Sequence, residues 1–363
     1  MGIFVALFLY LMALKVLNRD NTSKGRLIIS ILAGLGLWLV LALRSPFCGI
    51  DLVGGADGSV NYLNMFLTAT NYSVVQIIEG RLSTFSSVEV GWFVYCKLVS
   101  LLSTDFQFFL AITAFFQIFF IGFVFYKYSG DIILSYIVYF CFGLYVMSFS
   151  GLRQSTAFTL TFFSFHFLVN KKKWLFALIV LLASSLHTSA LVFLIAYPLQ
   201  KIRLDQGRGI ISIILVFAIV PFLSSIVSTI VPIIYGNRYQ YYQDEGGSIT
   251  LFLLYTLIFF FSLKIDITTI QERLCRNLIV FAVACQSLGY ISTGAMTRIG
   301  FYFSIFFTLL FPELVKVYSG TSGKRILFTI LALLFFAFFF LTNRGGYLNV
   351  VPYYFFWETP FIY

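Results

Sequence analysis

Long apolar runs recur along the whole chain and are separated by short polar connections. Of the 363 residues, 60% are hydrophobic and only 10% are charged, whereas about a quarter of an ordinary soluble domain is charged. Several runs approach the length of about 20 residues that a helix needs to cross a bilayer. We therefore predict an all-α, polytopic helical membrane protein with about 10 to 12 transmembrane or half-membrane helices.

Ten of the apolar runs are predicted to form spans. They cover residues 1–16, 27–43, 106–126, 131–149, 153–169, 209–230, 250–264, 277–293, 299–316 and 325–341. Two further stretches, 89–103 and 174–199, are harder to classify. We treat residues 1–363 as a single integral membrane domain with external loops at 44–88 and 231–249.

The positive charges gather in the short connections, where the positive-inside rule places them in the cytoplasm. These connections are Lys15 to Arg26, the three lysines at 171–173, residues 201–208 and residues 316–325. All fall on one side if 89–103 does not cross and 174–199 enters and returns as two short helices. In the alternative topology both stretches cross once, which leaves 171–173 outside. The net charge of +10 is thus explained by orientation, and no nucleic-acid partner is expected.

The first topology has a geometric consequence for the few charged groups within apolar runs. With a helix rise of about 1.5 Å per residue, Arg153 lies about 27 Å and His187 about 21 Å from the cytoplasmic edge. Both then lie in the outer half of the membrane, with His187 near the turn of 174–199. The alternative topology moves Arg153 to the cytoplasmic face.

Ionisable groups at membrane depth are costly and mark a functional site by default. Arg153-Gln154 stands at the head of an apolar run, and His187 lies among small hydroxyl residues in ASSLHTSA. A structural histidine is the competing interpretation of His187. Glu89 opens an apolar stretch of 15 residues; it is either a residue that begins a helix or a general base whose pKa is raised by apolar surroundings. In FFSFHF, His166 is assigned to the core.

The predicted external segments hold further polar candidates. Arg44 ends an apolar run before a glycine-rich segment that includes Asp51; its planar fork suits phosphate oxygens, although a snorkelling interfacial arginine is the alternative. Arg238 and Tyr239 lie in a segment of tyrosines and amides that suits sugar rings or an ordinary membrane interface. Arg298 resembles Arg153 in its position at the head of a span.

Several chemistries lack their sequence signals. The chain has two histidines and five cysteines in total, without a Walker loop, an HExxH motif or a Cys/His cluster. We therefore expect no metal site and no cofactor, and we assign the scattered cysteines to the apolar core.

The order of these landmarks resembles the EpsG family within the broader Wzy-type polysaccharide polymerases. The matching features are Arg44 with Gly49-Ile50-Asp51 and Tyr62, Glu89 with Gly91, Arg153-Gln154 with Ala157, His187 with Ser189-Ala190, Arg298 with Tyr302, and Val351-Pro352-Tyr353. The resemblance spans nearly the whole chain. The segment between Asp51 and Tyr62 is longer and richer in glycine than the family pattern.

The resemblance implies a GT-C-like integral membrane glycosyltransferase, multi-pass in the bacterial cytoplasmic (inner) membrane. Such an enzyme joins oligosaccharide repeat units carried on undecaprenyl pyrophosphate at the outer face, making O-antigen, capsule or exopolysaccharide. Its partners are the lipid-linked donor and acceptor and membrane lipid, with a chain-length regulator and a flippase as candidate protein partners.

The residues of this sequence fit such a reaction in distinct roles. Arg153 is expected to stabilise the pyrophosphate leaving group, and His187 or Glu89 to act as the base. The expected substrate-binding residues are Arg44, Asp51, Gln154, Arg238, Tyr239, Arg298 and Tyr302. Two other classes stay open: a flippase or transporter of lipid-linked oligosaccharides, and a polytopic sugar acyltransferase.

Overall fold

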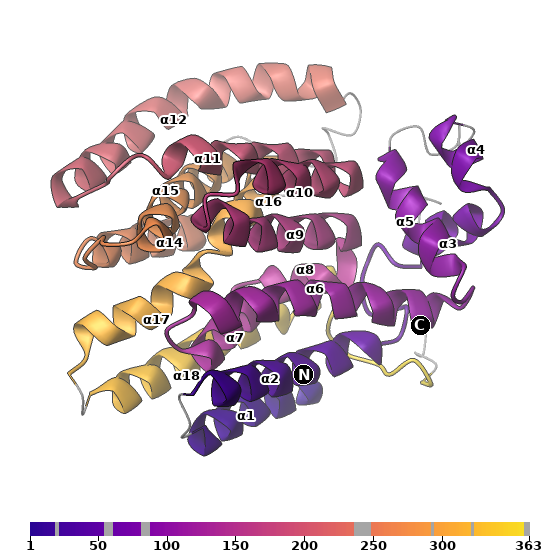
Figure 1. The fold of residues 1–363 in the computed structure, drawn as a ribbon, viewed down its shortest axis with the longest axis horizontal. Coiled ribbons are helices and arrows are strands. Elements are labelled where there is room, and N and C mark those ends of the chain that lie inside the picture. Colours follow the sequence, from indigo (N-terminus) through magenta and orange to yellow (C-terminus); the bar gives the residue numbers. More distant parts are fainter. Residues whose placement is uncertain are drawn as a thin grey trace. The chain divides into compact units, whose positions relative to one another are not determined.

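A computed structural model describes residues 1–18, 22–53, 61–80, 88–235, 248–291, 294–320 and 323–358. The described chain is helical and contains no β-strand beyond an isolated antiparallel bridge between Arg44 and Phe355. Two compact units divide it (Figure 1). Unit 1 comprises 1–167, 174–191 and 325–363, and unit 2 comprises 168–173 and 192–324.

Unit 1 contains most of the N-terminal helices and the last long helix. Its elements are α1 (Gly2–Leu17), α2 (Ser23–Ala42), α3 (Tyr62–Thr70), α4 (Val74–Ile78), α5 (Val90–Ser100), α6 (Phe106–Tyr128), α7 (Ile132–Cys141), α8 (Leu144–Ser150), α18 (Lys324–Asn343) and the 3-10 turn η3 (Tyr347–Asn349), with most of α9 (Leu152–Val169) and α10 (Lys173–Leu186). The short helices α3, α4 and α5 lie beyond the N-terminal end of α6 (Figure 1).

Small residues allow α2, α6 and α7 to pack closely. A Cβ atom on Gly122 of α6 would lie 2.7 Å from the Tyr136 hydroxyl. That hydroxyl donates to the carbonyl of Ser30 at 3.0 Å, and the Ser30 hydroxyl donates to the carbonyl of Gly122 at 3.0 Å. Such close approach and interhelical hydrogen bonding are typical of helices packed within a membrane.

One end of unit 1 collects its basic connections. An ion pair between Lys15 and Asp131 joins the end of α1 to the start of α7. The Arg26 guanidinium donates to the carbonyls of Tyr126 and Ser129 at 2.9 and 2.8 Å. The start of α2 therefore meets the end of α6 at the same end of the unit.

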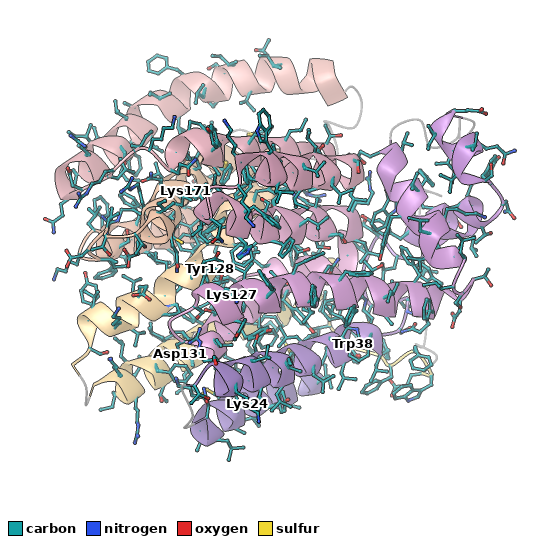
Figure 2. The ribbon with its side chains drawn as sticks, in the orientation of Figure 1. Lys24, Trp38, Lys127, Tyr128, Asp131 and Lys171 are labelled. Atoms are coloured by element: carbon teal, nitrogen blue, oxygen red, sulfur yellow. The ribbon has the colours of Figure 1, made fainter. Side chains whose placement is uncertain are left out.

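Helix α9 connects this basic end to the other end of unit 1. The Tyr128 hydroxyl hydrogen-bonds His166 Nδ1 at 2.7 Å, so the last turns of α9 lie near the end of α6. Figure 2 shows Tyr128 in the basic end and Trp38 toward the other. Arg153 precedes His166 by 13 residues, about 20 Å along a helix. Arg153 therefore lies far from the basic end, as the depth argument predicts.

Unit 2 is built around a buried helix. Its elements are α11 (Ala196–Leu199), α12 (Gln206–Tyr235), α14 (Ile249–Ser262), α15 (Ile270–Ile291), α16 (Gly294–Ser304), α17 (Phe307–Tyr318) and the second half of the 3-10 helix η2 (Thr188–Ile195), whose first half belongs to unit 1. Helix α15 packs against α12, α14 and α16. Of the most apolar 18-residue stretch of α15, 78% is buried. Of the most apolar 18-residue stretch of α12, only 11% is buried. Helix α12 therefore presents an apolar surface that suits contact with lipid.

The polytopic helical membrane fold is confirmed. Five helices are long and apolar enough to span a membrane, and two bent pairs raise the number to seven among the described residues. The predicted spans 131–149 and 299–316 are each formed by a bent pair of helices, because α7 and α8 meet at 54° and α16 and α17 at 56°. Gly143, with a left-handed φ of 80°, makes the first bend possible.

The two stretches that were hard to classify agree with the first topology, in which 89–103 does not cross the membrane and 174–199 enters and returns. Helix α5 has 11 residues, about 16 Å of helix against a hydrocarbon core of about 30 Å. Residues 173–201 run as α10, then His187, then η2 and α11. Because Lys173 and Lys201 line the same cavity, the stretch returns to where it began.

Two helices extend beyond the spans predicted for them. Helix α12 continues to Tyr235, so it enters the predicted external loop 231–249. Helix α15 begins at Ile270, seven residues before the predicted span. All five cysteines are buried and free, as the assignment to the core predicts.

Candidate functional site

Three separate segments of unit 1 bring Glu89, Arg153 and His187 together. Arg153 Nη1 donates to Glu89 Oε2 in an ion pair. His187 Nδ1 lies 3.3 Å from Glu89 Oε1, within ion-pair distance but obliquely placed for a hydrogen bond. The three side chains are 18 to 27% exposed, so the group is accessible. We call these residues, together with Thr188, the Glu89 cluster.

The Glu89 carboxylate connects α9 to the turn after α10. Glu89 is the residue before α5, yet its side chain does not cap that helix. Its Oε1 atom instead accepts from the backbone N–H of Thr188 at 2.8 Å and from the Thr188 hydroxyl at 3.1 Å. The carboxylate therefore has a partner on each side.

These partners decide the ionisation state of Glu89. Burial alone would raise the pKa of the carboxyl, but the contact with His187, the charge of Arg153 and the Thr188 N–H lower it to about 2. The expectation of a raised pKa is wrong, because the surroundings of Glu89 are cationic and rich in donors. Such a carboxylate is a poor general base near neutral pH and a good anchor for the side chains of Arg153 and His187.

A close contact between α5 and α10 fixes where Glu89 lies. A Cβ atom on Gly91 would lie 2.4 Å from both the carbonyl oxygen and the Oγ of Ser185. Only glycine permits this approach. It brings the start of α5 against the last turn of α10, directly before His187.

Arg153 is held by its backbone as well as by its side chain. Its backbone N–H donates to the Tyr62 hydroxyl at 3.2 Å, and the Tyr62 ring packs edge-on against Trp92 with 5.5 Å between centroids. The Nε of Arg153 is buried and has no hydrogen-bond partner among the described residues. The guanidinium therefore keeps a donor that the Glu89 cluster does not use.

Asp51 and Gln154 lie next to these residues. The Ser150 hydroxyl donates to Asp51 Oδ2 at 2.8 Å, and the Asp51 carbonyl accepts from the Tyr62 N–H at 3.0 Å. Asp51 thus joins the end of α8 to the start of α3, which carries Tyr62. Gln154 is 5% exposed and belongs to the packed face of α9.

Comparison with known proteins assigns the chain to a family. A family model described as the EpsG family matches residues 27–355, nearly the whole chain. The chain belongs to the EpsG family. It is therefore a polysaccharide-polymerase-type membrane protein, as the order of its landmarks predicts. No curated protein and no solved structure matches the chain.

The EpsG landmarks divide by their surroundings. Glu89, Arg153 and His187 meet in the Glu89 cluster, whereas Arg44 has no such role. Arg44 is 1% exposed, and its guanidinium donates to the carbonyls of Leu41 and Ser148, each at 3.0 Å. These contacts are those of a structural arginine, so its surroundings do not support the predicted substrate-binding role.

The remaining predicted residues of this EpsG chain belong to unit 2 or lie outside the described residues. Arg298 and Tyr302 are on α16 of unit 2, where Tyr302 is fully buried and Arg298 is half-buried. Their role with Arg153 stays a prediction. Arg238 and Tyr239 lie outside the described residues. No group of three or more His, Cys, Asp or Glu residues in the described part of the chain could hold a metal ion.

Sequence reasoning missed two kinds of contact. Thr188 is a direct partner of Glu89, and its place beside His187 was the available signal. The Gly91–Ser185 approach had no signal in a single sequence, because it depends on how two distant segments pack.

Proposed function

We propose that this EpsG-family protein is a glycosyltransferase that joins oligosaccharide repeat units carried on undecaprenyl pyrophosphate. The reaction takes place at the outer face of the bacterial cytoplasmic membrane and yields O-antigen, capsule or exopolysaccharide. The observation that supports it most is the Glu89 cluster, in which an accessible arginine and a histidine share one carboxylate. The cluster lies at the end of unit 1 away from the basic connections, and the positive-inside rule assigns that end to the outside.

The reaction requires one bond to break and one to form. The bond between the anomeric carbon of the growing chain and its pyrophosphate oxygen breaks, and the same carbon bonds to a hydroxyl oxygen of the next lipid-linked unit. Negative charge grows on the departing pyrophosphate, and the hydroxyl loses a proton. Arg153 stabilises the pyrophosphate, because a guanidinium matches phosphate oxygens with paired donors.

The structure favours His187 over Glu89 as the group that takes the proton. The pKa of Glu89 is lowered to about 2, so this carboxylate binds a proton too weakly near neutral pH. Nδ1 of His187 faces Glu89 at 3.3 Å. A small ring rotation makes a hydrogen bond from Nδ1–H to the carboxylate, which leaves Nε2 as the acceptor. Glu89 then orients both the guanidinium of Arg153 and the imidazole of His187.

We also propose that arginine supplies the positive charge that a divalent metal ion supplies in other phosphate chemistries. Polymerisation by the purified protein should therefore persist in excess chelator. Activity that is lost in chelator and restored by magnesium would contradict this part of the proposal.

Deletion of the gene tests the reaction class. Single repeat units should accumulate on the lipid carrier at the outer face. Units trapped inside would indicate a flippase, and full-length chains lacking acyl groups would indicate an acyltransferase.

The chain's two histidines provide a matched pair of variants for complementing that deletion. His187→Gln should fail to restore long chains, because it removes the proposed base. His166→Gln should restore them, because His166 contacts Tyr128 in the opposite end of unit 1. Equal chain lengths from the two variants, at equal protein abundance, would overturn the role of His187.

A further inference from the structure

Unit 2 contains a cavity of about 310 Å³ that has no part in the proposed reaction. Four of its lining residues are basic: Lys171, Lys173, Lys201 and Arg273. None of the described residues that line it is acidic. Pockets for small ligands begin at about 300 Å³, so the cavity is large enough for a charged headgroup.

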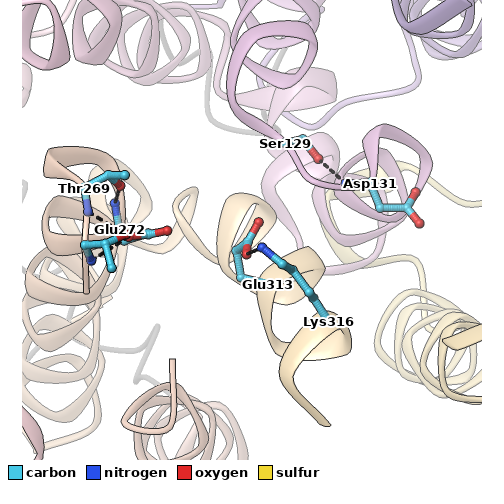
Figure 3. A network of polar contacts seen from close by, with 7 residues as sticks. Ser129, Asp131, Thr269, Glu272, Glu313 and Lys316 are labelled. Carbon is cyan, nitrogen blue, oxygen red and sulfur yellow. Dashed lines mark hydrogen bonds and ion pairs between the residues drawn. The ribbon is translucent and has the colours of Figure 1, made fainter. Parts of the chain in front are cut away.

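The nearest acidic side chain in the sequence does not neutralise these charges. Glu272, beside Arg273, accepts from the backbone N–H groups of Thr268 and Thr269, both at 2.8 Å. Figure 3 shows its carboxylate turned toward Thr269. This carboxylate is therefore engaged in capping the start of α15.

The polar groups of the cavity retain unused donors. Arg273 Nη1 donates to the Gln200 carbonyl at 3.2 Å, while its Nε is buried without a hydrogen-bond partner among the described residues. The Lys201 ammonium lies 5.8 Å from the centre of the Tyr197 ring. Several basic side chains thus converge on a cavity whose described lining contains no acidic residue, an arrangement that favours an anion with several oxygens.

The cavity forms where helices of the chain end or begin. Leu168 is in the last turn of α9, Lys173 begins α10, Gln200 follows α11 and Ile270 begins α15. The ends of membrane helices lie at the membrane surface, which is also the level of phospholipid phosphates. We infer that this cavity binds a phosphate-bearing anion, supplied either by an anionic lipid headgroup or by a soluble phosphate. This inference does not depend on the proposed polymerase reaction.

Lys171 allows a test in which loss of binding is not confused with unfolding. Its φ of 59° is left-handed, a conformation that glycine adopts more readily than lysine. Lys171→Gly therefore removes the charge and relieves the backbone at once. Lys201→Ala removes a second cavity charge, and Lys324→Ala is the matched control, because Lys324 is an exposed lysine that does not line the cavity.

Binding is measured on the purified full-length protein in a neutral detergent, by native mass spectrometry. The probes are phosphatidylglycerol, phosphatidylcholine of the same chain length, and sodium phosphate against sodium chloride at equal ionic strength. The wild type should prefer phosphatidylglycerol, and each cavity lysine removed should weaken binding about fivefold. Lys324→Ala should bind as the wild type does.

The different probes distinguish the two sources of phosphate. Retention of phosphatidylglycerol that depends on Lys171 and Lys201 supports a lipid headgroup. Binding of inorganic phosphate with the same dependence, and without a lipid preference, supports a soluble ligand. Equal binding of both lipids with no effect of phosphate, or equal losses in Lys171→Gly and Lys324→Ala, overturns the inference.

Discussion

Two arginines of unit 1 have opposite surroundings. Arg44 is 1% exposed and is enclosed by two carbonyl oxygens and the ring of Phe149, whose centroid is 5.0 Å from the guanidinium carbon. The side chain of Arg153 is 21% exposed and is balanced by a carboxylate that also contacts His187. A guanidinium closed off by the backbone holds the fold, whereas one that is partly open to solvent can bind an incoming anion.

The largest effect expected from this contrast is that of Arg153→Lys. Lysine keeps the charge but loses the planar fork, so polymerisation should fall by about 100-fold, as on removal of a key charge-stabilising donor. The measurement is glycan chain length in cells that carry the variant, at matched protein abundance. Unchanged chain length would remove Arg153 from the reaction.

Glu89→Gln tests whether Glu89 orients the cluster. Activity at pH 7 should fall by about 10- to 100-fold, because neither Arg153 nor His187 keeps the carboxylate that orients it. A carboxyl whose folded pKa is lowered stabilises the fold above its ordinary pKa and loses that contribution as pH falls through the folded value. The stability gap to the wild type should thus be constant from pH 5 to 8 and shrink between pH 4.5 and about 2.

The pH profile of activity is a separate readout on the same variant. Because Glu89 stays ionised above pH 4.5, the acidic limb of the wild-type profile between pH 5 and 8 should not arise from this carboxyl. If the acidic limb of the activity profile disappears in Glu89→Gln, the assignment of Glu89 as an anchor is contradicted.

Gly91→Ala should have an intermediate effect of about 10-fold on activity, because a small misplacement of catalytic groups is costly. The added methyl group would collide with the Ser185 carbonyl and push α5, with Glu89, away from α10. The control is Val90→Ala, since Val90 is 46% exposed. Chain-length assays on both variants at equal abundance make the measurement, and equal activities would show that the close approach is not needed.

Arg44→Gln should affect abundance more than activity per molecule. The substitution shortens a side chain that serves two buried carbonyls, which should destabilise the protein by about 3 kcal/mol. The midpoint of thermal unfolding and the amount of protein in membranes measure the effect. A variant that is stable but inactive would contradict the structural role of Arg44 and support its predicted role in substrate binding.

Seven of the ten predicted spans correspond to helices or bent helix pairs that are long and apolar enough to cross a membrane, because apolar runs reveal such helices directly. The start of α15 shows the limit of that signal. Its first turns carry Glu272, Arg273 and Arg276, which hydropathy excludes from a span. Arg276 donates to the carbonyls of Leu204, Ser262 and Ile265, so unit 2 itself satisfies this charge. The Thr269-x-x-Glu272 capping pattern was the signal available for the true start.

The site was predictable in part. Arg153 and His187 were expected at similar depth because helix rise converts sequence distance into height. Their shared contact with Glu89 was not predictable, since height says nothing about which helix faces which. The lowered pKa of Glu89 follows from that contact, and so could not be foreseen either.

The antiparallel bridge between Arg44 and Phe355 has a consequence for biogenesis. The N–H of Ser45 donates to the carbonyl of Tyr354 at 2.8 Å, so an early segment of unit 1 is completed by a segment that is synthesised much later. All of residues 192–324, which belong to unit 2, are synthesised in between. The surroundings of Arg44 therefore stay incomplete during membrane insertion until residues 354–355 have been synthesised.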